Sequence, residues 1–371
     1  MTSIDYNRND TISLCMIVKN EEKYLERCLK SVEGVVDEII IVDTGSTDQT
    51  TKISEKFGAK ILEYQWNDDF SSARNYSLKN AKCDWILVLD ADEELDSQSK
   101  DKLREAINYD TGIVNFLYII EELNALKLQY PQARLFRNHA GIEYNYPVME
   151  NIYKSIDKYT QNGKNYRDYP IYINHFSFED IEGNAERFIR DSGMIDNTLN
   201  NSLLPHNDSV YFLLKQIYYY RFLNVEPQRV LELINNVFSL VQQIQYKDLV
   251  FEPAILYLNI YIIDYLFQIE KIENAKQIVE NALKFYPDSL NLLYRFFRLE
   301  LAMDNYEEGV KLLIKCQNLI KNNKYHKFEF LALDSLVSVI NSYLIEFSHQ
   351  GYDIEELTKD LENEQREKDA F

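Results

Sequence analysis

Short apolar runs alternate with helical patterns over the N-terminal part of the chain. Four of these runs are expected to be buried strands, at 11–18, 38–42, 59–64 and 85–89. Between the first two, apolar side chains recur at helical spacing over residues 21–32. Strands that are apolar throughout and alternate with amphipathic helices are typical of a parallel sheet covered on both faces. The pattern predicts an α/β domain that binds ligands at the carboxyl ends of its strands.

The pattern changes twice further along the chain. From about residue 112 to 178, short β-like pieces are separated by polar turns, which indicates a mixed sheet closing one side of a site. After about residue 191 the strand signals stop and long helical patterns follow. The sequence therefore predicts two domains, an α/β domain over residues 1–190 and an all-α domain over residues 191–371.

The helical part contains an internal repeat. Residues 271–282 align with residues 305–316 at an offset of 34 residues, and small side chains occupy equivalent positions, Ala275 with Gly309 and Ala282 with Cys316. A period of 34 residues is that of tetratricopeptide helical hairpins, in which small residues allow paired helices to approach closely. Two units are few for such an array, so we expect neighbouring helices, at 209–223, 227–241 and 328–347, to complete the stack.

Composition and charge restrict the possible functions. The chain has 371 residues and a net charge of −20, which argues against binding of duplex nucleic acid. Its four cysteines lie far apart without metal-ligand spacing, which fits free thiols in a reducing compartment. Neither a signal peptide nor an apolar stretch long enough to span a bilayer is recognisable. A cytoplasmic protein is the expectation.

Two carboxylates follow the fourth predicted strand. Asp90 and Asp92 lie two residues apart where the run Trp85–Leu89 ends. Aspartates at the end of a buried strand are costly unless something neutralises them, and a divalent cation that bridges a diphosphate does so. The alternative is an acidic turn that caps a helix beginning near Ser97, which on spacing alone has about equal weight.

A third carboxylate, Asp43, ends the second predicted strand. Gly45 allows a tight turn after it, and Ser46 or Thr47 is placed to cap the next helix. Such a loop can hydrogen-bond a base or ribose, whereas Asp48 is better explained as an acid at the helix N-terminus. Neither GxxxxGK[ST] nor GxGxxG is present, which counts against P-loop enzymes and nicotinamide dehydrogenases.

Four motifs in order give a specific resemblance. The strings MIVKNEE from Met16, IVDTGSTD up to Asp48, DFSSARN from Asp69 and LDADE up to Glu93 together resemble family 2 glycosyltransferases. The later strings ARLFR, ending at Arg137, and INHF, around His175, resemble a bacterial subgroup that also carries tetratricopeptide-like helices. That subgroup includes enzymes that glycosylate peptides, such as the S-glycosyltransferases of glycosylated bacteriocins.

The resemblance implies a GT-A fold, a UDP-sugar donor and Mn²⁺ or Mg²⁺ as the cofactor. Asp43 would hold the uracil, Asp90 would face the ribose or the metal, and Asp92 and His175 would bind the metal. His175 taken alone is equally compatible with a buried histidine bonded to backbone. The resemblance implies the following contacts to the donor nucleotide: Val18, Asn20, Glu21, Asp43, Gly45, Arg74 and Asp90.

The expected chemistry is inverting transfer, in which one carboxylate deprotonates the acceptor. Glu150 is the first candidate for this base. Related enzymes often show Val-His-Glu here, whereas this chain has Val148-Met149-Glu150, so Met149 departs from the pattern. Asp69 is the second candidate, although a helix-capping role before Ser71 is favoured for it.

The leading hypothesis is transfer of a hexose or N-acetylhexosamine to a Ser, Thr or Cys side chain of a peptide or protein held partly by the helical domain. The alternatives are transfer to a cell-surface glycan or lipid-linked sugar, and a non-catalytic repeat scaffold. A homodimer is possible. The sugar, the acceptor and the acceptor atom are not fixed by the sequence.

Overall fold

The structure is a computed structural model, and it describes the chain in segments. The described residues are 10–108, 114–123, 126–160, 167–176, 181–201, 204–223, 225–243, 252–322, 324–325, 333–359 and 361. Contacts divide the chain into two compact units, the first formed by Met1–Asn124 with Gln129–Leu203, the second by Ala125–Leu128 with Leu204–Phe371.

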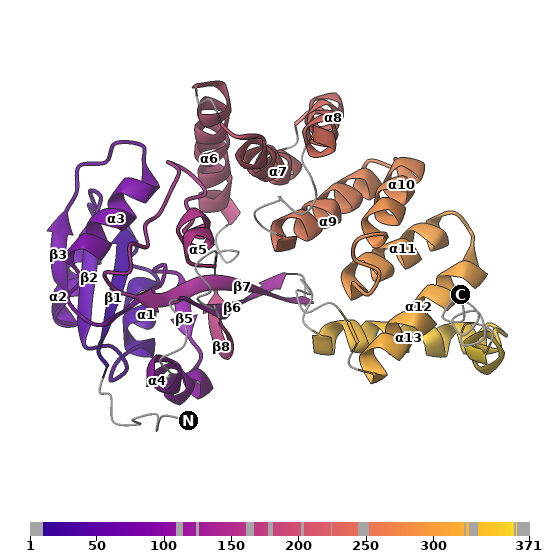
Figure 1. Ribbon diagram of the computed structural model, residues 1–371, viewed down its shortest axis with the longest axis horizontal. Helices are drawn as coiled ribbons and strands as arrows, with labels where there is room; N and C mark the ends of the chain where they lie inside the picture. The colour runs from indigo at the N-terminus through magenta and orange to yellow at the C-terminus, as the bar shows by residue number, and fades with distance from the viewer. Residues whose placement is uncertain are drawn as a thin grey trace. The chain divides into compact units, whose positions relative to one another are not determined.

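The first unit is built on an eight-stranded mixed sheet with the strand order β3-β2-β1-β4-β7-β6-β8-β5 (Figure 1). The strands are β1 Ile12–Val18, β2 Glu38–Asp43, β3 Lys60–Glu63, β4 Trp85–Val88, β5 Glu93–Leu95, β6 Val114–Leu123, β7 Leu126–Arg137 and β8 Arg167–His175. Strands β3, β2, β1 and β4 run parallel, as the alternation of apolar runs with helices predicts. Strand β7 is antiparallel to β4, and β5 is antiparallel to β8, whereas β6 and β8 are parallel.

Helices connect the strands of the first unit. They are α1 Leu25–Ser31, α2 Thr50–Lys56, α3 Phe70–Asn80, the short 3-10 helix η1 Ser97–Ser99, α4 Lys100–Asn108, α5 Tyr153–Thr160 and α6 Ile181–Asn201. Apolar side chains of β1, β4 and α1 form one buried cluster that includes Leu14, Leu87 and Leu29. The predicted α/β fold is therefore confirmed.

Two details differ from the prediction. Helix α2 begins at Thr50 after Gln49, and neither Ser46 nor Thr47 caps it, because both side chains bond within the preceding loops. Asp48 accepts a hydrogen bond from the Thr50 amide instead. Contacts group α6 with the N-terminal unit, whereas the first domain was expected to end at residue 190.

The second unit is helical, as predicted. Its helices are α7 His206–Phe222, α8 Pro227–Gln243, α9 Glu252–Gln268, α10 Ile272–Leu283, α11 Leu290–Ala302, α12 Tyr306–Lys321 and α13 Leu333–His349. The repeated segments form α10 and α12, and the helix between them, α11, packs against both. Residues 326–332 and 362–371, included in the sequence analysis, lie outside the described residues. No helix within the described segments is both long and apolar enough to cross a bilayer.

The small residues of the repeat lie in the helix contacts. Ala275, Ala282 and Cys316 are buried, and a Cβ atom built on Gly309 would lie 3.4 Å from Cδ2 of Phe297 on α11. That distance accommodates a methyl group but no branched side chain. Close approach of α11 and α12 therefore depends on the absence of a larger side chain at position 309.

We expect Gly309→Leu to destabilise the second unit by about 1–3 kcal/mol through overpacking against Phe297. Gly309→Ala should be neutral or slightly stabilising, since alanine favours a helix by up to about 1 kcal/mol. Urea unfolding followed by circular dichroism measures both. Gly193→Leu on α6 is the matched control, because a Cβ at Gly193 has no neighbouring atom within 4 Å. Equal losses at positions 193 and 309 would contradict the packing argument.

Candidate functional site

The carboxyl ends of β1, β2 and β4 meet at one edge of the parallel sheet. Val18 ends β1, Asp43 ends β2, and Asp90 follows β4 by two residues. The main-chain oxygen of Val18 accepts hydrogen bonds from the amide and the hydroxyl of Thr44, at 3.0 and 3.1 Å. Three motifs that are far apart in the sequence are thus brought together by the strand order.

The loops after β1 and β2 are bonded to each other. Asp43 accepts hydrogen bonds from the Ser46 amide at 3.1 Å and from the Ser46 hydroxyl at 2.6 Å. Asn20 donates its amide to Ser46 Oγ at 3.0 Å, and its side-chain oxygen accepts from the Thr47 amide at 2.7 Å. Gly45 has a φ of 108°, which favours glycine. These bonds fix the loop predicted to bind the base.

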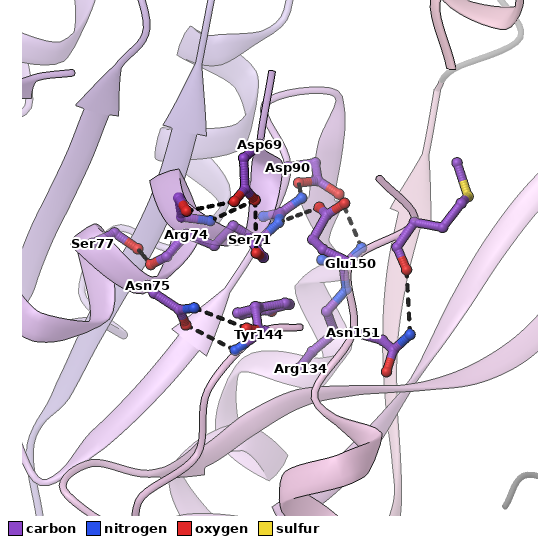
Figure 2. Close-up of polar contacts among 12 residues, drawn as sticks. Asp69, Ser71, Arg74, Asn75, Ser77, Asp90, Arg134, Tyr144, Glu150 and Asn151 are labelled. Atoms are coloured by element: carbon purple, nitrogen blue, oxygen red, sulfur yellow. Dashed lines mark hydrogen bonds and ion pairs between the residues drawn. The ribbon is translucent and has the colours of Figure 1, made fainter. Parts of the chain in front are cut away.

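Arg74 on α3 joins Asp90 to Glu150 (Figure 2). Its Nη2 lies 2.7 Å from Asp90 Oδ1, and its Nε lies 2.6 Å from Glu150 Oε1. The Arg74 and Glu150 side chains are 11% and 12% exposed, so this ion pair is shielded from solvent, whereas the Asp90 side chain is 32% exposed. The structure therefore places three of the predicted site residues in one network. It engages Arg74 with carboxylates of the protein itself, and whether Arg74 also contacts the nucleotide remains a prediction.

Arg134 on β7 binds the other oxygen of Asp90. Its Nη2 lies 3.1 Å from Asp90 Oδ2 and also contacts Glu93 Oε1. Burial alone would raise the pKa of Asp90, but the guanidinium groups of Arg74 and Arg134 outweigh that effect and hold this pKa well below its usual range. Asp90 is consequently ionised at neutral pH.

Helix α3 also fixes the loop that carries Glu150. The Asn75 side chain donates to the Tyr144 main-chain oxygen and accepts from the Tyr144 amide, both at 2.8 Å. The Phe70 amide donates to the main-chain oxygen of Pro147 at 2.9 Å. Met149 has a φ of 53°, a left-handed conformation that needs support from its surroundings. The DFSSARN motif thus holds Glu150 beside the strand ends.

Asp69 is the N-cap of α3. Its Oδ1 accepts from the Ser72 amide at 3.0 Å and from Ser71 Oγ at 2.7 Å, and its Oδ2 accepts from Ser72 Oγ at 2.6 Å. The capping role favoured from the sequence is confirmed. Both oxygens of Asp69 are occupied within the first helical turn, which leaves Glu150 as the better placed candidate base.

Strand β8 brings His175 next to Asp92. In the antiparallel pairing of β5 with β8, Glu93 lies opposite His175, and the Phe176 amide donates to the Asp92 main-chain oxygen at 3.0 Å. His175 Nε2 lies 3.3 Å from Asp92 Oδ2. No group of three or more His, Cys, Asp or Glu side chains suited to a metal occurs among the described residues. The protein can therefore offer a cation this pair, with other ligands supplied by a bound molecule.

Neither Asp90 nor Asp92 caps the helix near Ser97, because Asp96 does so through the Gln98 amide.

Glu21 lies near both aspartates, and its amide donates to Thr50 Oγ1 at 2.7 Å. Burial is the main reason that the pKa of Glu21 is raised to about 7, and the negative charges of Asp92 and Asp90 add to it. The strand ends thus form a region of concentrated negative charge.

Three site residues received no role in the sequence analysis. These residues are Glu93, Asn75 and Arg134. They occur within the quoted motifs, but their side chains contact residues far away in the sequence. A signal was available for Arg134, since a charged residue next to the apolar pair Leu135 and Phe136 needs a partner if it is buried with them.

The N-terminal part of the chain is similar to known proteins. The model of the family "Glycosyl transferase family 2" matches residues 13–178. A TPR repeat-containing protein of Synechococcus elongatus is 43% identical over 157 residues, which cover 42% of this chain and 39% of that protein. The SPbeta prophage-derived glycosyltransferase SunS of Bacillus subtilis is 32% identical over 156 residues, covering 39% of this chain and 36% of SunS. The chain thus spans less than two fifths of the length of these relatives.

Among solved structures, the crystal structure of Staphylococcus aureus TarS is similar with a TM-score of 0.41 and 17% sequence identity. The similarity covers 68% of this chain and 53% of that one.

We expect Arg74→Met to lower the free energy of unfolding of the first unit by about 3 kcal/mol, because it leaves the carboxylates of Asp90 and Glu150 without this partner. Urea unfolding at pH 7 measures the loss. A depressed carboxylate pKa stabilises the fold above the unfolded value of about 3.9 and does so less as pH falls. The difference between wild type and variant should therefore shrink below about pH 4.

Arg104→Met is the control for the loss of an exposed ion pair. The Arg104–Asp37 pair is 3.3 Å long and its side chains are 36% and 37% exposed. Its removal should cost less than about 1 kcal/mol. Equal costs for the two variants, or a cost for Arg74→Met that does not change with pH, would contradict the network described above.

Proposed function

We propose, from the match of residues 13–178 to family 2 glycosyltransferases, that the chain transfers a sugar from a UDP-sugar to a peptide or protein, with inversion and with a divalent cation. The observation that carries this proposal is the meeting of Asp43, Asp90 and the Asp92–His175 pair at one edge of the sheet. The expected combination of a GT-A-type domain with a helical domain supports it.

The donor site is proposed at the bonded loops after β1 and β2. Asp43 would receive the uracil, with Val18, Asn20, Glu21 and Gly45 around it. Asp43 is 8% exposed and already fixed by Ser46, so it would bind with little loss of side-chain freedom. Asp90, whose side chain is 32% exposed, would receive a ribose hydroxyl.

The residues present fit a divalent cation. Asp92 and His175 offer a carboxylate oxygen and an imidazole nitrogen 3.3 Å apart, a donor set suited to Mn²⁺. The nearby carboxylates also outnumber the guanidinium groups of Arg74 and Arg134. When bound, the cation would neutralise charge on the departing diphosphate.

Glu150 is proposed as the general base. It would accept the proton of the acceptor hydroxyl or thiol while the acceptor oxygen or sulfur bonds to C1 of the sugar. The bond between C1 and the phosphate oxygen breaks, and UDP leaves with the electron pair. Attack from the face opposite the leaving group inverts the configuration at C1. Arg74 would keep Glu150 aimed at the site, since it holds Glu150 Oε1 at 2.6 Å.

The proposal also includes a peptide as the acceptor. It is supported by the resemblance to bacterial enzymes that glycosylate peptides and by the helical unit, since stacked helical hairpins present extended binding surfaces. Deletion of the helical unit would test this role only if the first unit remains folded on its own. The cytoplasmic location and a homodimer remain predictions.

The test of the donor site is release of UDP from a panel of UDP-sugars with and without Mn²⁺. We expect Mn²⁺-dependent release from one or two sugars, and we expect Asp92→Ala to weaken Mn²⁺-dependent UDP binding by at least about tenfold. Isothermal titration of UDP measures the binding. Asp101→Ala, an exposed position on α4, is the control and should match wild type. Full binding by Asp92→Ala would refute the metal assignment.

The test of the base is Glu150→Gln, which keeps the size of the side chain and removes its basicity. Transfer to short peptides carrying Ser, Thr or Cys, read by the added mass of the sugar, should fall by about 10²–10⁴-fold. UDP affinity should change much less, because the substitution lies on the acceptor side. The control is Glu143→Gln, an exposed glutamate of the same loop. An unchanged transfer rate in Glu150→Gln would mean that another group is the base.

A further inference from the structure

Strand β7 places one charged side chain inside the sheet beside the end of β4. In the antiparallel pairing of these strands, Trp85 lies opposite Arg137 and Leu87 lies opposite Leu135. Arg134 precedes Leu135 on β7 and, because the strands are antiparallel, lies towards the end of β4 and the turn that follows it. Arg134 is 8% exposed, whereas its neighbours on the strand, Leu135 and Phe136, are fully buried and apolar.

Arg134 belongs to a closed ring of contacts around that turn. It contacts Asp90 Oδ2 at 3.1 Å and Glu93 Oε1. The second oxygen of Glu93 accepts a hydrogen bond from the Asp90 amide at 2.8 Å, and the Glu93 amide donates to the Asp90 main-chain oxygen at 3.0 Å. Figure 2 shows Arg134 and Arg74 approaching Asp90. The ring connects both the side chain and the backbone of Asp90 to a neighbouring strand.

The three charged groups of the ring differ in exposure. Glu93 is 1% exposed and Arg134 is 8% exposed, whereas the Asp90 side chain is 32% exposed. Arg134 Nε has no hydrogen-bond partner within the described part of the chain, so the two carboxylates supply its polar contacts there. A buried pair, Arg134 with Glu93, therefore supports a carboxylate that faces the outside.

We propose that Arg134 is a positioning residue of the donor site. With Glu93 as its buried counter-charge, Arg134 fixes Oδ2 of Asp90 while Arg74 fixes Oδ1. The Asp90 carboxylate then cannot turn, and the chain from Asp90 to Glu93 presents Asp92 in a fixed direction. This inference rests on the proposed function, because it assigns Arg134 to the binding of the donor.

The experiment compares Arg134→Met, Arg134→Lys and the double variant Arg134→Met/Glu93→Gln with wild type. The single Met variant leaves Glu93 buried without its partner and should lower the melting temperature. The double variant removes both charges, while the glutamine that replaces Glu93 can still accept the hydrogen bond of the Asp90 amide. Its melting temperature should return towards that of wild type. The double variant then has nearly the stability of wild type, but its Asp90 lacks the contact with Arg134.

Two measurements follow for each variant. UDP affinity in the presence of Mn²⁺ should be at least about tenfold weaker in both Met-containing variants, and Arg134→Lys should recover part of it. Without ligand, hydrogen exchange at the amides of residues 90–93 should be at least about tenfold faster than in wild type in both Met-containing variants. The matched control is Arg137→Met on the same strand, which breaks the 2.7 Å ion pair with Asp10 away from Asp90.

The outcomes distinguish a positioning role of Arg134 from a purely structural role. Restored stability with weak UDP binding and fast exchange in the double variant supports positioning by Arg134. Recovery of UDP affinity together with stability shows that Arg134 is only structural and overturns the inference alone. Weak UDP binding in Arg137→Met equal to that in Arg134→Met also overturns it. If wild type binds no UDP with any cation, the proposed function fails and the inference falls with it.

Discussion

The ion pairs around Asp90 are the interaction on which the rest of the site depends. Strand β4 is apolar and fully buried, so a carboxylate just after its end needs compensation from side chains that come from elsewhere in the fold. Arg74 arrives from α3 and Arg134 from β7, and each binds one oxygen of Asp90. The position of α3 against β1 and β2, and the antiparallel insertion of β7 beside β4, are therefore requirements of the site as well as of the core.

Arg74 connects the proposed donor side of the site with the proposed acceptor side. Arg74 contacts Asp90, on the proposed donor side, and Glu150, on the proposed acceptor side, within 2.7 Å. Asn75 and Phe70 hold the loop of Glu150 to the same helix, so α3 fixes the positions of Arg74 and Glu150 together.

The sequence was sufficient for the parts of the fold that depend on local pattern. Buried strands such as Trp85–Val88 and the small residues of the helical repeat are readable because each imposes its own periodicity. The start of α2 was predicted too early, since Ser46 and Thr47 bond to Asp43 and Asn20 rather than to the helix. The role of Arg134 was missed, because its partners lie 41 and 44 residues away and their meeting depends on the register of β7. Asp69 shows the opposite case, a cap decided by residues three positions apart.

Negative charge at the strand ends supports the proposed use of a cation. Glu21, Asp90, Asp92, Glu93 and Glu150 gather there, against the guanidinium groups of Arg74 and Arg134. Burial raises the pKa of Glu21 to about 7, and the negative charges of Asp92 and Asp90 add to the rise. A diphosphate would bring further negative charge to this edge and would be repelled by it. A cation held by the Asp92–His175 pair, as proposed above, would offset that charge.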